Sequence, residues 1–237
     1  MDGTVASSLA DFGISSYTPS LSVLLNSFQR KANNHSSFEL MVVAPTPGIT
    51  GIALPAVIEE LKCICKHASD FGLQNFSLEG EHATTMQVLS GMERCSWVHF
   101  ASTGIQDTAD PMKSGLLLDD GYLQLSDLMK KQLPNAEFAF LSACQTATGD
   151  QSCPEEAIHL AAGMLLAGYP GVVGTMWSIR DKDASFVADK VYKELLKDGT
   201  PNSAKAAQAL HAAIYHLRDR PGGCPFASWV PFIHIGV

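Results

Sequence analysis

The sequence predicts an α/β protein in which a mostly parallel sheet lies between two layers of helices. Short apolar runs alternate along the chain with longer segments of helical spacing, a pattern typical of parallel sheets with crossover helices. Two of these runs, 98–101 and 138–141, lead into small polar residues, as expected where buried strands reach the carboxyl edge of a sheet. With 237 residues, 46% of them hydrophobic, the chain can bury one large core. We therefore expect a single domain over 1–237.

The first part of the chain begins with a polar stretch, 1–16, which we expect to be a loosely ordered stub. Apolar spacing and cap residues then predict the following elements: a helix over 21–30 capped by Ser20, a strand over 38–44, a helix over 55–71, a short strand over 76–78, a helix over 83–92 capped within 82–84, and the strand over 98–101.

The second part begins with a segment of loop composition, 104–114. The elements expected after it are a hairpin over 115–123 with an Asp-Gly turn, a helix over 126–132 capped by Ser126, the strand leading to Cys144, a helix over 154–167 ending at Gly168, a strand over 172–177, helices over 181–198 and 203–217, and a last strand over 232–235.

Charge and hydropathy exclude several classes of partner. There are 16 basic and 24 acidic residues, with a net charge of −8 and no basic run, so a nucleic-acid partner is not expected. No apolar run reaches the length of a membrane span, and the start lacks the features of a secretory signal, which favours a soluble, cytoplasmic protein without a membrane partner.

The six cysteines are scattered along the chain and favour reduced thiols over a disulfide framework. Cys63 and Cys65 are separated by one residue, but no second cysteine pair is present to complete a zinc site. We therefore expect no metal and no cofactor.

A series of ordered motifs resembles the CHAT domain, a caspase-like family of clan CD cysteine peptidases related to caspases and separase. The matching segments are SSYTPSL, LPAVIEEL, EGEHAT, WVHFA, LLLDDG, LSACQTATGD, AAGMLLAGYPGVVGTMWSIRD and WVPFIHIG, which together extend over nearly the whole chain. The resemblance implies a caspase-like three-layer sandwich. It also implies that TPR-type helical repeats accompany the domain, because such repeats often precede it in fungal and bacterial members.

The resemblance implies a catalytic dyad of a His-Gly pair at one strand end and a cysteine at the next. Cys144 matches the nucleophile and Gly104 matches the glycine of the pair, but Thr103 stands where the family has its histidine. A thiol with a pKa near ~8.5 needs a base to become an efficient nucleophile, and a threonine hydroxyl does not titrate near neutral pH. Catalysis is therefore expected to be absent or barely measurable.

Three other histidines are alternatives for the missing base. His99 lies four residues before Thr103 on the same strand, roughly 13 Å away at ~3.3 Å per residue, and is better explained as a buried, hydrogen-bonded core histidine. His82, which precedes a helix, and His159, within one, remain minor alternatives, because a general base must lie within about 3 Å of the proton that it removes.

The same resemblance suggests that Gln145, Trp177, Ser178 and Asp181, at or beyond carboxyl strand ends, shape a substrate cleft, as do Thr146 and Asp150. Asp181 has an alternative explanation, which we favour, as the cap of the helix that follows it. Cleavage specificity does not follow from these residues.

Two functional hypotheses follow from these residues. The first is a pseudopeptidase that keeps Cys144 and acts by binding or regulating a protein or peptide partner. The alternative is an active cysteine endopeptidase whose base is supplied by a rearrangement or by a partner.

Overall fold

The computed structural model describes residues 11–30, 38–45, 55–105, 107, 109–142, 144–145, 156–177 and 179–237. Its helices are α1 (Leu21–Arg30), α2 (Pro55–Ser69), α3 (Thr85–Arg94), α4 (Leu125–Leu128), α5 (Glu156–Ala167), α6 (Asp181–Leu195), α7 (Ala206–Arg218) and α8 (Phe226–Trp229). Its strands are β1 (Glu39–Ala44), β2 (Gln74–Glu79), β3 (Trp97–Phe100), β4 (Thr103–Ile105), β5 (Gly115–Leu118), β6 (Gly121–Gln124), β7 (Phe138–Leu141), β8 (Cys144–Gln145), β9 (Gly171–Thr175) and β10 (Phe232–Gly236).

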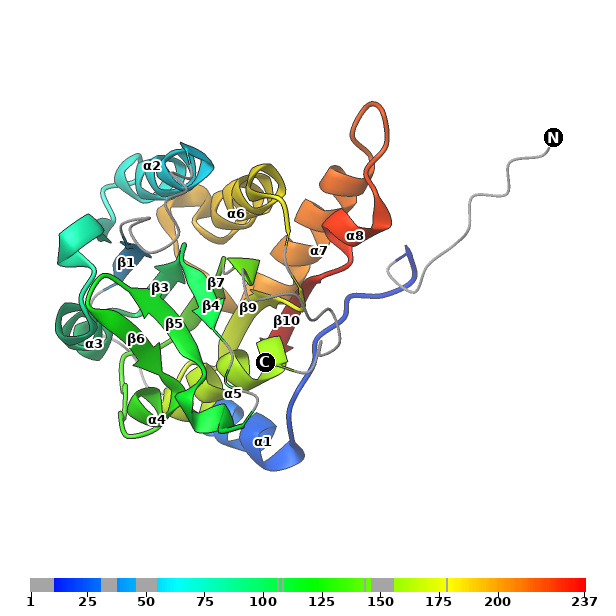
Figure 1. The fold of residues 1–237 in the computed structure, drawn as a ribbon. Helices are drawn as coiled ribbons and strands as arrows, with labels where there is room; N and C mark the ends of the chain where they lie inside the picture. Colours follow the sequence, from blue (N-terminus) through cyan, green and yellow to red (C-terminus); the bar gives the residue numbers. More distant parts are fainter. Residues whose placement is uncertain are drawn as a thin grey trace.

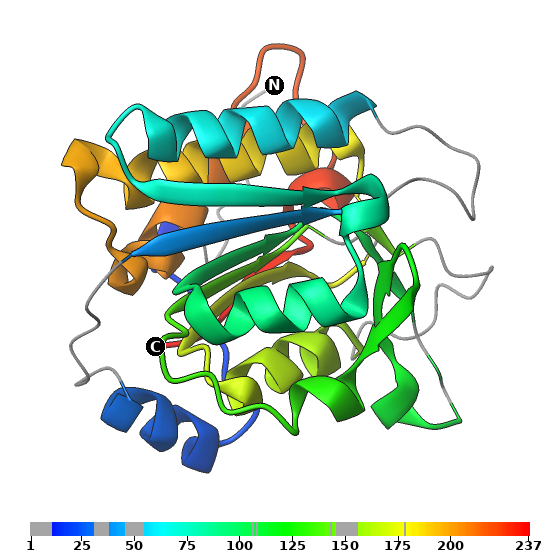
Figure 2. The same ribbon diagram turned by 90° about the vertical axis from the view of Figure 1, so that its left-hand side faces the viewer.

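The central sheet has six strands in the order β10-β9-β7-β3-β1-β2, and every neighbouring pair is parallel except β10 with β9. Helices cover both faces (Figures 1 and 2). This confirms the predicted three-layer architecture with a mostly parallel sheet. None of the described helices has the length and apolar character needed to cross a membrane.

The two faces of the sheet bury two separate cores because side chains alternate along each strand. On one face, Trp97, Phe138 and Phe140 pack with α2, α6 and α7. On the other face, Val98, Phe100 and Leu141 pack with α3, α4, α5 and the β5–β6 hairpin. The strands are buried on both sides, which explains why their sequences are continuously apolar.

A second, smaller sheet has the order β6-β5-β4-β8 and lies beyond the carboxyl ends of β3 and β7. This separate sheet was not predicted from the sequence. The assignment of 104–114 to a loop was wrong for Gly104 and Ile105, which pair with Leu116 and Gly115 of β5. A three-residue strand that contains glycine carries too little β propensity to be recognised from sequence.

Most of the predicted elements are confirmed, with shifted ends. Ser20 caps α1, where its Oγ accepts the Val23 amide at 3.2 Å, and Thr84 caps α3 through the Gln87 amide at 3.4 Å. The hairpin turns through Asp119 and Asp120, whereas Gly121 pairs with Leu118. Its turn is therefore Asp-Asp, not the predicted Asp-Gly.

The helix predicted over 126–132 was wrong in its bounds and its cap. Helix α4 ends at Leu128, and its N-cap is Gln124, whose side chain makes no capping bond. The chain leaves the helix early so that the Leu133 amide can donate to Ala167 O at 3.1 Å while the Leu133 side chain is buried. Tertiary contacts therefore override a segment of good helical composition.

The N-terminal segment is attached to the edge strand β10. Tyr17 forms a parallel bridge with Ile235, through its amide to His234 O at 2.9 Å and its carbonyl to the Gly236 amide at 2.8 Å. Ser16 Oγ lies 2.7 Å from His234 Nδ1 and donates to Gly236 O at 3.0 Å. Of the predicted stub, residues 1–10 lie outside the described part of the chain.

Burial lowers the pKa of His234 from 6.5 to about 4, and its Nε2 has no hydrogen-bond partner in the described part of the chain. Between these two pH values the unfolded chain binds more protons than the folded one, so stability falls as pH falls through this window. Between pH 6.5 and about pH 4, this group lowers the free energy of unfolding by about 1.4 kcal/mol per pH unit.

We therefore expect the free energy of unfolding of the natural chain to drop by about 2 kcal/mol more between pH 7 and pH 5 than that of His234→Asn, which keeps an amide near Nδ1 but does not titrate. Urea denaturation of both proteins at each pH gives this difference. An identical pH dependence in the two proteins would contradict the assignment.

Candidate active site

The candidate site is built where β3 and β7, neighbours in the central sheet, leave it together and pair again in the small sheet. Beyond the ends of these strands, the Ala101 amide donates to Val43 O and the Ser142 amide to Phe100 O, both at 2.8 Å, which extends the central ladder. The small sheet then begins with Thr103 paired to Cys144 and Gly104 paired to Gln145, in parallel register. Two residues 41 positions apart are thus fixed as direct neighbours, about 4.8 Å apart across the ladder.

Position 103 is partly accessible from solvent, as are Ser102 and Ile105. Thr103 is partly buried and Gly104 is buried. The hydroxyl of Ser102 is inaccessible to solvent and makes no hydrogen bond within the described part of the chain. For Cys144 and Gln145 the structure describes the backbone only, so their pairing with Thr103 and Gly104 is the geometric information at the site.

His99 is completely buried, on the face of the sheet that packs against α2 and α6. Its ring stacks on Phe140, with the ring centroids 5.0 Å apart, and its Nε2 lies 3.1 Å from Oε1 of Glu60, which is 3% exposed. This confirms that His99 is a core residue. The contact meets the distance for an ion pair, but its angles are poor for a hydrogen bond, and neither ring nitrogen forms one with a described residue. The predicted hydrogen bonding of His99 is therefore not observed.

Glu60 was missed by the sequence analysis, although a signal for it was present. It lies on the same helical stripe as Leu61 and Ile64, which are buried in the core. A carboxylate on the apolar stripe of an amphipathic helix requires a buried partner. The matching polar residue in an apolar strand is His99.

The other predicted base candidates lie elsewhere. His82 ends the 3₁₀ turn Gly80–His82 that follows β2, and β1 and β3 lie between β2 and β7 in the sheet. The side chain of His159, on α5, lies outside the described part of the structure.

Of the predicted cleft residues, the structure describes two side chains. The indole Nε1–H of Trp177, beyond the end of β9, donates to Ala227 O of α8 at 3.2 Å. Asp181 is the first residue of α6, and the N-cap is Arg180, so the interpretation of Asp181 as the cap was wrong by one position. Ser178, Thr146 and Asp150 lie outside the described residues.

A buried carboxylate, Asp183, follows in the same first turn of α6 and was also missed. It is 2% exposed and accepts from Arg180 Nε at 2.7 Å, and Arg220 Nη1 lies 3.4 Å from its other oxygen. This network holds the start of α6 against the loop that follows β9. No local sequence signal pairs Asp183 with Arg220, because 37 residues separate them.

Two cavities lined by described residues lie away from Cys144. One cavity, of about 570 Å³, lies near the amino ends of β7 and β9, between residues such as Leu133, Pro170 and Pro201. Another, of about 380 Å³, is apolar and lies between α7, α8 and β10.

Three of the four cysteines with described side chains have environments that oppose the thiolate. Burial raises the pKa of Cys95 to about 12, with Glu39 adding to it, and burial also raises the pKa of Cys65. Burial and a hydrogen bond to Asp189 raise the pKa of Cys63 to about 12. All four are free thiols, and these three are poor candidates for an alternative nucleophile.

Among the solved structures similar to this chain are two caspase-like cysteine peptidases, a gingipain and a separase. The Porphyromonas gingivalis RgpB pro- and mature-domain complex has a TM-score of 0.60 at 10% identity, with the match covering 89% of this chain and 52% of that one. The Saccharomyces cerevisiae separase–securin complex has a TM-score of 0.58 at 14% identity, covering 94% of this chain and 14% of that one. The chain thus spans about half of the gingipain chain and a small part of separase, and these likenesses establish a caspase-like fold.

The family model of the CHAT domain matches residues 5–237, and the chain therefore belongs to the CHAT domain family. This confirms the resemblance found in the sequence. A comparison with curated protein sequences found no match.

The buried pair of His99 and Glu60 leads to a prediction about stability. Glu60→Ala leaves the buried His99 imidazole without the carboxyl group beside it and should lower the free energy of unfolding by about 1–3 kcal/mol. The double variant Glu60→Leu/His99→Phe replaces both polar groups by apolar ones and should be close to neutral or stabilising. Chemical denaturation of the two variants tests this, and a double variant less stable than Glu60→Ala would contradict it.

Proposed function

We propose that this CHAT domain is a pseudopeptidase or a very weak peptidase that keeps the nucleophile position, Cys144, and acts by binding or regulating a protein or peptide partner. The observation that carries the proposal is the direct pairing of Thr103 with Cys144. The backbone position opposite the cysteine holds a residue that cannot accept a proton near neutral pH.

The loss of rate expected without a histidine base is large enough to favour an inactive domain over a slow enzyme. In a serine peptidase, loss of the histidine base lowers turnover by about 10⁶-fold. A cysteine suffers less, because a few per cent of the thiol is already ionised at neutral pH. The only described imidazole on β3, that of His99, is sealed in the core between the sheet and helices α2 and α6. It could not take the place of the missing base without unpacking that core.

The expected partner is a protein or a peptide. The separase to which this chain is similar is bound to the protein securin in its crystal structure. We propose that a corresponding partner binds here near the carboxyl ends of β7 and β9, where Gln145, Trp177, Ser178 and Asp181 are the candidate contacts. In this proposal the chain works as one intracellular, cytoplasmic domain alongside TPR-type repeats.

The alternative is a working cysteine endopeptidase whose base comes from a partner or from a rearrangement. The observation that favours it is the retention of both Cys144 and the buried Gly104 at the paired strand ends. Turnover of a peptide or protein substrate by the natural chain, lost in Cys144→Ala, would establish the alternative.

We expect Thr103→His to create peptidase activity where the natural chain has none that exceeds Cys144→Ala. The substitution restores an imidazole on the residue paired with Cys144, at a position that is partly exposed and can accept a larger side chain. Hydrolysis of a fluorogenic peptide library measures the gain, which should exceed tenfold over background.

Two matched controls accompany this variant. Thr103→Asn introduces a polar side chain without a base and should remain inactive, and Thr103→His/Cys144→Ala should lose the gain. Equal activity in the histidine and asparagine variants would show that position 103 does not act on the thiol.

Alkylation of Cys144 gives an independent measure of its state. In the natural chain we expect the pH midpoint of iodoacetamide labelling at Cys144 to lie at or above about 8.5, because no paired base draws off the proton. Mass spectrometry of the peptide that contains Cys144 separates its labelling from that of the other five cysteines. A midpoint well below ~8 would mean an activated thiolate and would favour the endopeptidase.

A further inference from the structure

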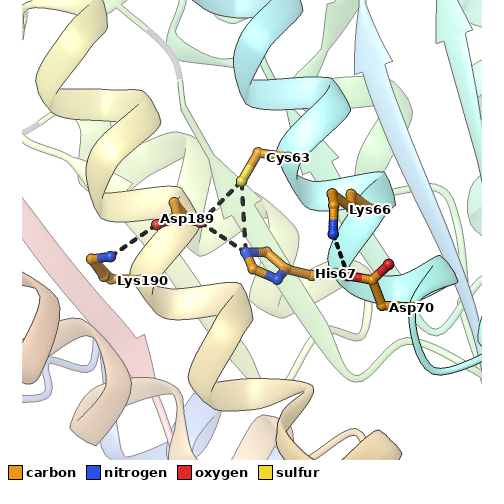
Figure 3. Close-up of polar contacts among 6 residues, drawn as sticks. All are labelled: Cys63, Lys66, His67, Asp70, Asp189 and Lys190. Carbon is orange, nitrogen blue, oxygen red and sulfur yellow. Dashed lines mark hydrogen bonds and ion pairs between the residues drawn. The ribbon is translucent and has the colours of Figure 1, made fainter.

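Three potential metal ligands from two neighbouring helices converge away from the candidate active site. Cys63 and His67 lie one turn apart on α2, and Asp189 faces them from α6 (Figure 3). Cys63 Sγ is 2.9 Å from Asp189 Oδ1, His67 Nε2 is 2.8 Å from the same oxygen, and the sulfur and the nitrogen are 3.6 Å apart. All three side chains are partly exposed, so an ion from solvent can reach them.

We propose that Cys63, His67 and Asp189 form a binding site for Zn²⁺ or a similar divalent transition-metal ion, which clamps α2 to α6. Thiolate, imidazole and carboxylate are the three side-chain groups that zinc binds in proteins, and three protein ligands leave a fourth position for water.

The separations between the ligand atoms fit tetrahedral coordination of one ion if Asp189 moves slightly away from Cys63 and His67. Zinc distances of about 2.3 Å to sulfur and about 2.0–2.1 Å to nitrogen and oxygen require ligand atoms roughly 3.4–3.6 Å apart. The sulfur–nitrogen separation of 3.6 Å already has this value. The two contacts to Asp189 are shorter by roughly half an ångström, as expected where protons rather than a metal ion hold the atoms together.

Binding of the ion displaces two protons, one from Cys63 and one from His67. The Cys63 thiol proton, which is donated to Asp189, is released to solvent, and the sulfur binds as thiolate. The proton on His67 Nε2 must leave as well, so that the imidazole binds through Nε2 in its Nδ1–H tautomer. One thiolate and one carboxylate then balance the two charges of the ion.

Lys190 orients the carboxylate of Asp189, whereas Lys66 is paired outside the cluster. Lys190 Nζ lies 3.1 Å from Oδ2 of Asp189, which leaves Oδ1 turned toward Cys63 and His67. Lys66, on the same helix as Cys63, is bound to Asp70 at 2.6 Å. Hydrogen bonds to the outer oxygen of a ligating carboxylate orient it for the metal.

The environment also argues against a second catalytic triad at this place. Burial and Asp189 raise the pKa of Cys63 to about 12, so the thiol is a poor nucleophile. Burial alone would raise the pKa of Asp189, but hydrogen bonds from Cys63, His67 and Lys190 outweigh it and lower the value to about 2.

The test is titration of the metal-free full chain with Zn²⁺ by calorimetry, and with Co²⁺ by absorbance. We expect one ion per chain, a thiolate-to-Co²⁺ charge-transfer band, and a rise in Tm of about 5–10 °C at a hundredfold excess of zinc over Kd. Affinity should fall at least tenfold in Cys63→Ser and in Asp189→Asn, a near-isosteric change.

Two variants on α2 serve as matched controls. Cys65→Ala removes a thiol and Asp70→Asn removes a carboxylate, both outside the cluster, and both should keep the affinity and the band. Because the cobalt band is read on the natural chain, the test remains decisive if a variant fails to fold. Absence of the band, or zinc binding that persists unchanged in Cys63→Ser and Asp189→Asn, would overturn the proposal.

Discussion

Backbone hydrogen bonds between two neighbouring parallel strands hold the candidate active site together. β3 and β7 pair in the central sheet, and their continuations β4 and β8 pair again in the small sheet, so one ladder determines that residue 103 faces residue 144. Both strands are buried by helices on each side, which prevents a shift in register, because a slip of one residue would turn apolar side chains away from their core. The identity of residue 103 therefore bears directly on the chemistry open to Cys144.

Much of the fold could be predicted from sequence because its strands are apolar on both faces and its helices have one apolar stripe. The strands around Val98 and Phe140 and the caps Ser20 and Thr84 were predicted from such local patterns. The small sheet was not, because the short strand around Gly104 is stabilised by its partners rather than by its own residues. The early end of α4 has the same cause, since the Leu133 amide bonds to a residue of α5.

The polar clusters were the least predictable part of the molecule. His99 with Glu60, Asp183 with Arg220, and His67 with Asp189 each join residues that lie 37 to 122 positions apart. The Cys63 cluster does not have the paired-cysteine spacing of a zinc motif, because its other two members are a histidine one turn later and an aspartate on another helix. Such sets become visible only when the packing of α2 on α6 is known.

The position of Tyr17 beside β10 has a consequence for behaviour between molecules. An edge strand offers unpaired amides and carbonyls that a strand of a second chain can join, which is a common route to aggregation. Tyr17 uses the His234 carbonyl and the Gly236 amide, so this edge is already blocked at its centre. The opposite edge strand, β2, has no buried residue, and Gln74, Ser77 and Glu79 are exposed along its length. Intermolecular strand pairing should therefore involve β2 in the natural chain. Removal of the segment around Tyr17 should expose β10 as a second edge and increase such pairing.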